Sequence, residues 1–475
     1  MLFSSLLFLY VFLPAVLLLI LASSQKWHNA ILLMASLIFY AWGGVSYSLL
    51  LIGSILINYY IGKKIGQTLV KRGKKRWLIA GLVINLGLLV VFKYAHFLTE
   101  NLNLLLPHEQ QWSLPAIALP LGISFFTFQA ISYLVDVYDN RTPAQQSLPK
   151  LALFISFFPQ LIAGPIVRYH DIADQIRSRS INWALFSSGL ERFILGLGKK
   201  VLLANNFARL ADDIFAVAPV NLDPLTAWTG VLMYSLQIYF DFSGYSDMAI
   251  GLGRMFGFQI PENFNFPYIA RSIREFWRRW HISLSQWFRD YLYIPLGGNR
   301  HKPARTYFNL FIVFLLTGLW HGASWNFIIW GLLHGFFMII ERLGFGKVLA
   351  QLGNPIGHLY TLLVVGITWV FFRAPDLTYA LGYLKALVIP SHSNFQFDLA
   401  FYFSYELWMA LILGLFASTP IFRTLHQRFT VHLAQAPTLF IAYELLTTFG
   451  LLFIFLYCTM NLVTNAYNPF IYFRF

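Results

Sequence analysis

The stretch FWRRWHISLSQWFRDYLYIPLGGNR (Phe276–Arg300) leads into an apolar run that contains LWHG (Leu319–Gly322) and ends near Gly335. Its first part is basic and aromatic, whereas its second part is apolar enough to enter a membrane. An ionisable ring in hydrocarbon is costly and is therefore a candidate functional residue by default. The stretch predicts a membrane fold with a functional histidine inside it, His321.

The depth of His321 follows from helix geometry. If the apolar run enters the bilayer as a helix near Tyr307, a rise of about 1.5 Å per residue places His321 about 20 Å along it. The hydrocarbon layer is about 30 Å thick. We therefore expect this ring well inside the membrane, past the midplane from its side of entry.

The composition of the whole chain agrees with a membrane fold. Of 475 residues, 58% are hydrophobic and 11% are charged, whereas soluble domains carry about 25% charged residues. The mean hydropathy is +0.61. The apolar runs are continuous rather than alternating, which favours α-helices over a β-barrel. We predict an all-α polytopic membrane protein in which residues 1–475 form a single membrane domain.

The apolar runs predict roughly eleven transmembrane helices, with shorter helices at the membrane faces. The segment Phe157–Pro165 is interrupted by prolines and a glycine and predicts a re-entrant or kinked element, and the number of crossings within 140–225 stays open. Irregular backbone at membrane depth requires cover from protein or a cavity. The predicted runs are 3–22, 30–43, 46–62, 77–98, 116–138, 225–250, 307–321, 324–340, 356–372, 401–418 and 438–463.

Charge predicts the orientation. The net charge is +14, and the bases gather in short segments such as 63–76, which holds seven and no acid. This pattern favours cytoplasmic loops rather than nucleic-acid binding. The first 25 residues lack Lys and Arg, so we expect Ser5–Leu21 to be a retained helix and not a signal peptide, with the N-terminus outside.

Few other motifs offer chemistry. The chain has one cysteine, Cys458, which excludes an intramolecular disulfide and a Cys-rich metal site. Neither an HExxH metal motif nor a GxSxG nucleophile motif is present. Asp241 and Asp247 lie in the run 225–250 and should cap, pair or line a cavity rather than meet lipid.

His321 suits a general base. Desolvation favours its neutral, proton-accepting form, which could activate a Ser, Thr or sugar hydroxyl to attack a thioester. Trp320 covers one side and Gly322 leaves room for a close approach. The common alternative for a buried histidine is a hydrogen-bonded structural ring, and we assign that role to His334.

The arginines of 271–289 admit two interpretations. A basic and aromatic segment can simply anchor the chain at the cytoplasmic face. Alternatively, Arg278, Arg279 and Arg289 form an electrostatic mouth for a phosphate-bearing acyl donor, since guanidinium forks bind such groups well. Asn263 and Asn265 favour turn-capping roles.

A family resemblance rests on these motifs. Pro261–Arg300 resembles the membrane-bound O-acyltransferase (MBOAT) family, most closely its bacterial branch of alginate O-acetylation membrane subunits. Gly318–Gly322 matches the histidine motif of that family. The resemblance extends over nearly the whole chain through Pro165, Tyr239–Asp247, Trp369–Ala374 and Asn468–Phe475.

The resemblance implies a ring of tilted helices around a thin centre, with a tunnel from cytoplasm to periplasm. His321 would be catalytic, and His281 would be a second catalytic or structural histidine. No metal and no tightly bound cofactor is expected. The donor would be a cytoplasmic thioester, acetyl-CoA or an acyl carrier protein. The chain would lie in the inner membrane of a bacterium. Its partner would be a periplasmic SGNH-type acetyltransferase. The candidate substrate-binding residues are Trp320, Arg278, Arg279, Arg289, Asp290 and Asn263.

Two functions are therefore considered. The first is an O-acyltransferase that carries acetyl across the inner membrane for O-acetylation of an exopolysaccharide, alginate-like, with cellulose and peptidoglycan as alternatives and teichoic acid D-alanylation more distant. The second is a transporter or flippase for a lipid-linked sugar or acyl intermediate, with His321 as a relay residue. The inverted repeats common in transporters are not evident in this sequence, which weighs against the second.

Overall fold

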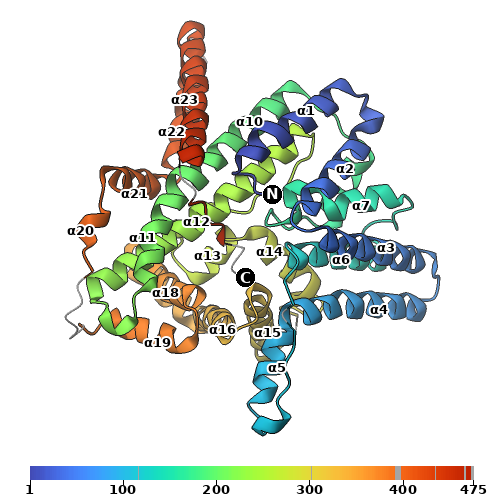
Figure 1. Ribbon diagram of the computed structural model, residues 1–475, viewed down its shortest axis with the longest axis horizontal. Helices are drawn as coiled ribbons and strands as arrows, with labels where there is room; N and C mark the ends of the chain where they lie inside the picture. The colour runs from blue at the N-terminus through green and yellow to red at the C-terminus, as the bar shows by residue number, and fades with distance from the viewer. Residues whose placement is uncertain (116, 301, 391–396, 434, 465–466, 472–475) are drawn as a thin grey trace. The chain divides into compact units, whose positions relative to one another are not determined.

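The computed structural model describes residues 1–475 except 116, 301, 391–396, 434, 465–466 and 472–475. The described residues form helices and connecting turns, without a strand among them (Figure 1). The predicted all-α fold is therefore confirmed. In the tail Asn468–Phe475, which carries part of the family resemblance, residues 472–475 lie outside the described residues.

The chain divides into two compact units. The first comprises Met1–Leu190, Ala249–Pro261 and Arg289–Tyr291, and the second comprises Glu191–Met248, Glu262–Phe288 and Leu292–Phe475. Two helices, α10 (Trp183–Gly198) and α12 (Pro224–Met255), begin in one unit and end in the other. The single membrane domain and its central tunnel stay predictions.

In the first unit α3, α4 and α6 pack side by side (Figure 1). Asn58 of α3 and Asn85 of α4 exchange side-chain hydrogen bonds of 3.1 and 2.8 Å. Such amide pairs hold apolar helices together where lipid offers no alternative partner. The helices of this unit are α1 (Leu13–Ala22), α2 (His28–Ala41), α3 (Val45–Gln67), α4 (Lys71–Leu89), α5 (Ala95–Asn103), α6 (Ile123–Tyr138), α7 (Leu148–Ser156), α8 (Phe158–Leu161) and α9 (Tyr169–Arg177).

The predicted break at Phe157–Pro165 is confirmed. Helix α7 ends at Ser156, a single turn of helix forms α8, and the backbone is irregular beyond it. Residues 151–167 are all buried, so protein covers this backbone. Gly122 allows the close approach, because it has a φ of +73° and a Cβ there would lie 2.5 Å from the carbonyl oxygen of Leu161.

The second unit has an aromatic core that includes Trp330, Trp369 and Tyr234. Its helices are α11 (Asn205–Ala216), α13 (Ile273–Arg279), α14 (Ile282–Phe288), α15 (Pro303–His321), α16 (Trp325–Ile340), α17 (Gly346–Leu352), α18 (Asn354–Arg373), α19 (Leu377–Ala386), α20 (Leu399–Tyr402), α21 (Tyr405–Ala417), α22 (Ile421–Leu433) and α23 (Pro437–Thr464). Short π-helical turns, η5 (Lys199–Ala204) and η9 (Glu341–Phe345), interrupt the longer runs.

The two aspartates of α12 pair as expected. Asp241 binds Lys200 at 2.7 Å, while Asp247 binds Arg192 at 2.8 Å and Lys199 at 2.6 Å. A charge removed from water is retained only when it is paired. The two carboxylates of α12 are therefore paired inside the protein rather than exposed to lipid.

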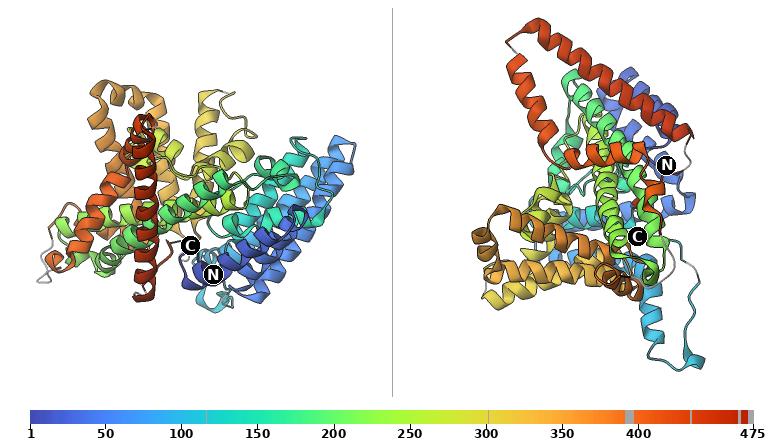
Figure 2. Two further views of the ribbon diagram at one scale, coloured as in Figure 1. Left: turned by 90° about the horizontal axis from the view of Figure 1, so that it is seen from above. Right: turned by 90° about the vertical axis from the view of Figure 1, so that its left-hand side faces the viewer.

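The protein is a multi-pass membrane protein. Five described helices are long and apolar enough to cross a membrane: Val45–Gln67, Lys71–Asn103, Trp325–Leu352, Asn354–Arg373 and Pro437–Thr464. A sixth crossing results if α21 and α22, bent by 67°, count as one. A total near eleven stays a prediction. The hairpin of α22 and α23, red in Figure 2, includes one helix, α22, that the sequence analysis did not predict.

Candidate active site

His321 is the last residue of α15. Its ring lies 4.9 Å from the ring centre of Trp320, 4.9 Å from that of Trp330 and 5.2 Å from that of Phe372, each at a steep angle. The side chain is 5% exposed. His321 is therefore enclosed by aromatic rings but not completely sealed, and it does not lie on the outer surface of its unit.

Glycines bring α15 and α16 close enough to form this enclosure. A Cβ on Gly331 would lie 2.3 Å from the carbonyl oxygen of Phe314 and 2.9 Å from the Cα of Gly318. The backbones of the two helices therefore touch, which places Trp330 against His321. The room that Gly322 leaves is filled, because a Cβ there would lie 2.1 Å from the ring of Phe327.

His281 is the second histidine of the site. It lies in the turn between α13 and α14, and its side chain is completely buried. Its φ of +43° is unusual for a residue with a side chain and costs about 1–3 kcal/mol, a strain that tends to occur at functional sites. Burial lowers the pKa of His281 to about 3. The ring is therefore neutral at physiological pH.

The structure brings His281 and His321 together. Their ring centres are 6.5 Å apart, and Trp320 contacts both, at 5.9 Å from His281 and 4.9 Å from His321. The two histidines are separated by 40 residues of sequence. The predicted catalytic pair and Trp320 thus form one cluster, with Asn263 bonded to it through His281 Nδ1 at 3.0 Å.

The sequence analysis did not single out the residues that complete this cluster. Trp330 and Phe372 flank His321, and Phe242 packs edge-on against His281 at 4.7 Å. Phe242 and Phe372 lie in segments that carry the family resemblance, which is the signal that could have identified them. Trp330 has no such signal, because an aromatic residue in an apolar helix is common.

His334 has the structural role predicted for it. It is completely buried. Its Nδ1 accepts a hydrogen bond from the indole N–H of Trp277 at 3.2 Å, so its proton must lie on Nε2, which contacts Thr368 Oγ1 at 3.0 Å. Both ring nitrogens are occupied within the protein.

Arg278 and Arg279 line an open hollow of about 540 Å³ together with Arg274 and Glu275. Neither His281 nor His321 lines this hollow. Arg279 binds Glu275 at 2.9 Å, whereas Arg278 is exposed. The hollow is therefore net positive and open to an anionic ligand.

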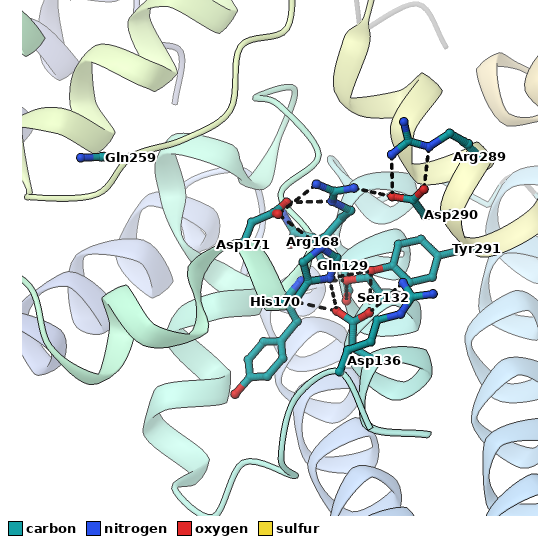
Figure 3. A network of polar contacts seen from close by, with 12 residues as sticks. Gln129, Ser132, Asp136, Arg168, His170, Asp171, Gln259, Arg289, Asp290 and Tyr291 are labelled. Carbon is teal, nitrogen blue, oxygen red and sulfur yellow. Dashed lines mark hydrogen bonds and ion pairs between the residues drawn. The ribbon is translucent and has the colours of Figure 1, made fainter. Parts of the chain in front are cut away.

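Arg289 and Asp290 belong to the first unit, where they join a polar network (Figure 3). Asp290 accepts a hydrogen bond from Arg289 Nε at 2.7 Å and pairs with Arg168, which also binds Asp171 at 2.8 Å. Two guanidinium groups thus bind Asp290, which indicates a structural role for this carboxylate. Arg289 remains half-exposed.

Comparison with known proteins agrees with this arrangement. The sequence model of the MBOAT, membrane-bound O-acyltransferase family, matches residues 141–372. The chain is 49% identical over 391 residues to the probable alginate O-acetylase AlgI of Pseudomonas aeruginosa, which covers 82% of this chain and 75% of that protein. The chain therefore belongs to the membrane-bound O-acyltransferase family, and it is an O-acyltransferase.

Two further relatives show how the family varies. The peptidoglycan O-acetyltransferase of Helicobacter pylori is 43% identical over 423 residues, which cover 82% of this chain and 80% of that protein. The teichoic acid D-alanyltransferase of Bacillus subtilis is 32% identical over 237 residues, which cover 46% of this chain and 58% of that protein.

Proposed function

We propose that this enzyme transfers acetyl groups from a cytoplasmic thioester, acetyl-CoA, across the inner membrane for O-acetylation of an alginate-like exopolysaccharide. The observation that carries the proposal is the convergence of His281 and His321 in one buried aromatic cluster. A base shielded from bulk water accepts a proton from a hydroxyl without competing hydration. The similarity to a probable alginate O-acetylase supports the acetyl group and the polymer.

In the proposed chemical step, His321 acts as the general base. A hydroxyl oxygen attacks the carbonyl carbon of the thioester while its proton passes to a ring nitrogen of His321. The C–S bond then breaks, and the leaving thiolate takes that proton from the imidazolium. Base catalysis of this kind contributes typically 10²- to 10⁴-fold, and the aromatic rings around His321 restrict its orientation.

The positive charge of a surface hollow supports the proposed binding of the acyl donor. Arg274, Arg278 and Arg279 surround the open hollow, and phosphate groups of a donor such as acetyl-CoA would bind there. The base-rich start of α4 at Lys71–Arg76 favours the cytoplasm for that end of the helix. This orientation agrees with an N-terminus in the periplasm and with delivery to a periplasmic SGNH-type acetyltransferase partner.

The test uses inverted membrane vesicles and labelled acetyl-CoA. His321→Ala should abolish transfer of label to polymer, while the protein remains folded and inserted. His334→Gln is the matched control, because His334 is a buried histidine of the same unit with both nitrogens bonded. Full transfer by His321→Ala would refute the role of His321. Export of a lipid-linked sugar without transfer of label by the unmodified enzyme would instead support the flippase alternative.

A further inference from the structure

We propose that Asn263 is a positioning residue that holds His281 with its proton on Nδ1, so that Nε2 is the second proton-accepting atom of the acyl-transfer site. The inference rests on the proposed function for the role of the site. It also revises the prediction that Asn263 binds substrate. Asn263 is completely buried, and it acts on the reaction through His281.

The orientation of the Asn263 amide follows from its neighbours. The atom that contacts His281 Nδ1 at 3.0 Å also receives the backbone N–H of Ser283 at 3.2 Å and the Ser283 hydroxyl at 2.8 Å. A backbone N–H can only donate, so this atom must be the amide oxygen. An oxygen that accepts from Nδ1 requires the proton on Nδ1, which leaves a lone pair on Nε2.

Asn263 is itself fixed from two sides. Its amide nitrogen donates to Ser246 Oγ of α12 at 2.9 Å, and its backbone carbonyl accepts from the N–H of Ile282, at the start of α14, at 2.9 Å. Rotation of the amide would break the bonds to Ser246, Ser283 and His281 together. The tautomer of His281 is therefore imposed by a rigid part of the fold, as is common for histidines that act as bases.

The Nε2 atom of His281 is buried and makes no hydrogen bond with the residues that the structure describes. His334 is the informative contrast, because its protein partners occupy both nitrogens and impose the opposite tautomer. A buried acceptor without a partner is uncommon and needs a reason. A substrate hydroxyl is the chemical group that fits, since it can donate to Nε2.

The distance between the rings of His281 and His321 is compatible with one substrate hydroxyl that bonds to both. The ring centres of His281 and His321 are 6.5 Å apart, which is farther than two imidazoles joined by a direct hydrogen bond of about 3 Å between nitrogens would be. One hydroxyl between the rings could bond to both. The rings of Phe242, Trp320 and His321 contact His281, and among these three side chains His321 is the ionisable one.

The first experiment reads the tautomer directly by ¹⁵N NMR of protein labelled at histidine, with His281→Gln to identify the signal. The unmodified enzyme should show His281 protonated at Nδ1 and unprotonated at Nε2. Asn263→Ala should mix the two tautomers. A proton on Nε2 in the unmodified enzyme would overturn the inference, whatever reaction the enzyme catalyses.

The second experiment measures acetyl transfer against pH. Asn263→Ala should lower kcat at least tenfold with little change in the KM of the donor. Asn263→Asp keeps an acceptor for Nδ1 and should retain transfer at neutral pH. Its carboxylate favours the imidazolium, so activity should fall on the acid side at a pH at least one unit higher than in the unmodified enzyme.

The controls separate the outcomes. Thr368→Val removes a partner of His334 and should leave the pH profile unchanged. If Asn263→Ala does not fold, Asn263→Asp still decides through its pH profile. An unchanged kcat in Asn263→Ala, or an unchanged profile in Asn263→Asp, refutes the inference, whereas full transfer by His321→Ala refutes only the proposed function.

Discussion

The ion pair between Lys200 and Asp241 offers a quantitative test of the second unit. The two groups are 2.7 Å apart and their side chains are only 3% and 2% exposed. Lys200 also donates to the carbonyl of Pro469, and Asp241 accepts from the N–H of Ile471 at 2.8 Å. The pair therefore joins η5, α12 and the C-terminal segment.

Lys200→Met removes the cation and leaves Asp241 buried. At 2.7 Å and an effective dielectric constant of 20, the lost attraction is about 6 kcal/mol. Removal of one partner of a buried pair typically costs 3–5 kcal/mol, and we expect a loss of stability in that range. Lys200→Met combined with Asp241→Leu should recover most of it, because no unpaired charge then remains.

The assay is unfolding of the purified protein in detergent, by heat or by titration with SDS. A single variant as stable as the unmodified protein, or a double variant less stable than the single one, would refute the reasoning.

Three other predictions address separate features. Gly331→Leu should separate α15 from α16 and abolish transfer, because its Cβ would lie 2.3 Å from the Phe314 carbonyl oxygen, whereas Gly450→Leu, with open space around it, should be tolerated in a transfer assay. Burial alone would raise the pKa of Asp290, but its arginine partners lower it. The contribution of the ionised Asp290 to stability is therefore present above about pH 4 and is lost as the pH falls further. Asp290→Asn should accordingly flatten the acid side of a plot of melting temperature against pH. Arg278→Glu should raise the KM for acetyl-CoA severalfold at low salt with little change in kcat, and an unchanged KM would exclude the hollow as the donor site.

Local patterns were sufficient for much of the fold. The runs 307–321 and 324–340 predicted α15 and α16 to within a few residues, because hydrophobic length is a property of the chain itself. Proline and glycine likewise marked the break after Ser156. The helix α22 was missed, because it is amphipathic and basic, and such a pattern resembles a polar connection.

The sequence by itself determined the membrane class and the family resemblance, and it predicted a functional role for His321, since each rests on local composition or on contiguous motifs. Only the tertiary structure decided which residues meet. His281 and His321 come together through the packing of α13, α14 and α15, while Arg289, only eight residues beyond His281, joins the other unit. Sequence reasoning could not predict that His281 Nε2 makes no hydrogen bond with the described residues, or that both nitrogens of His334 are bonded. A tautomer is set by hydrogen bonds to residues distant along the chain.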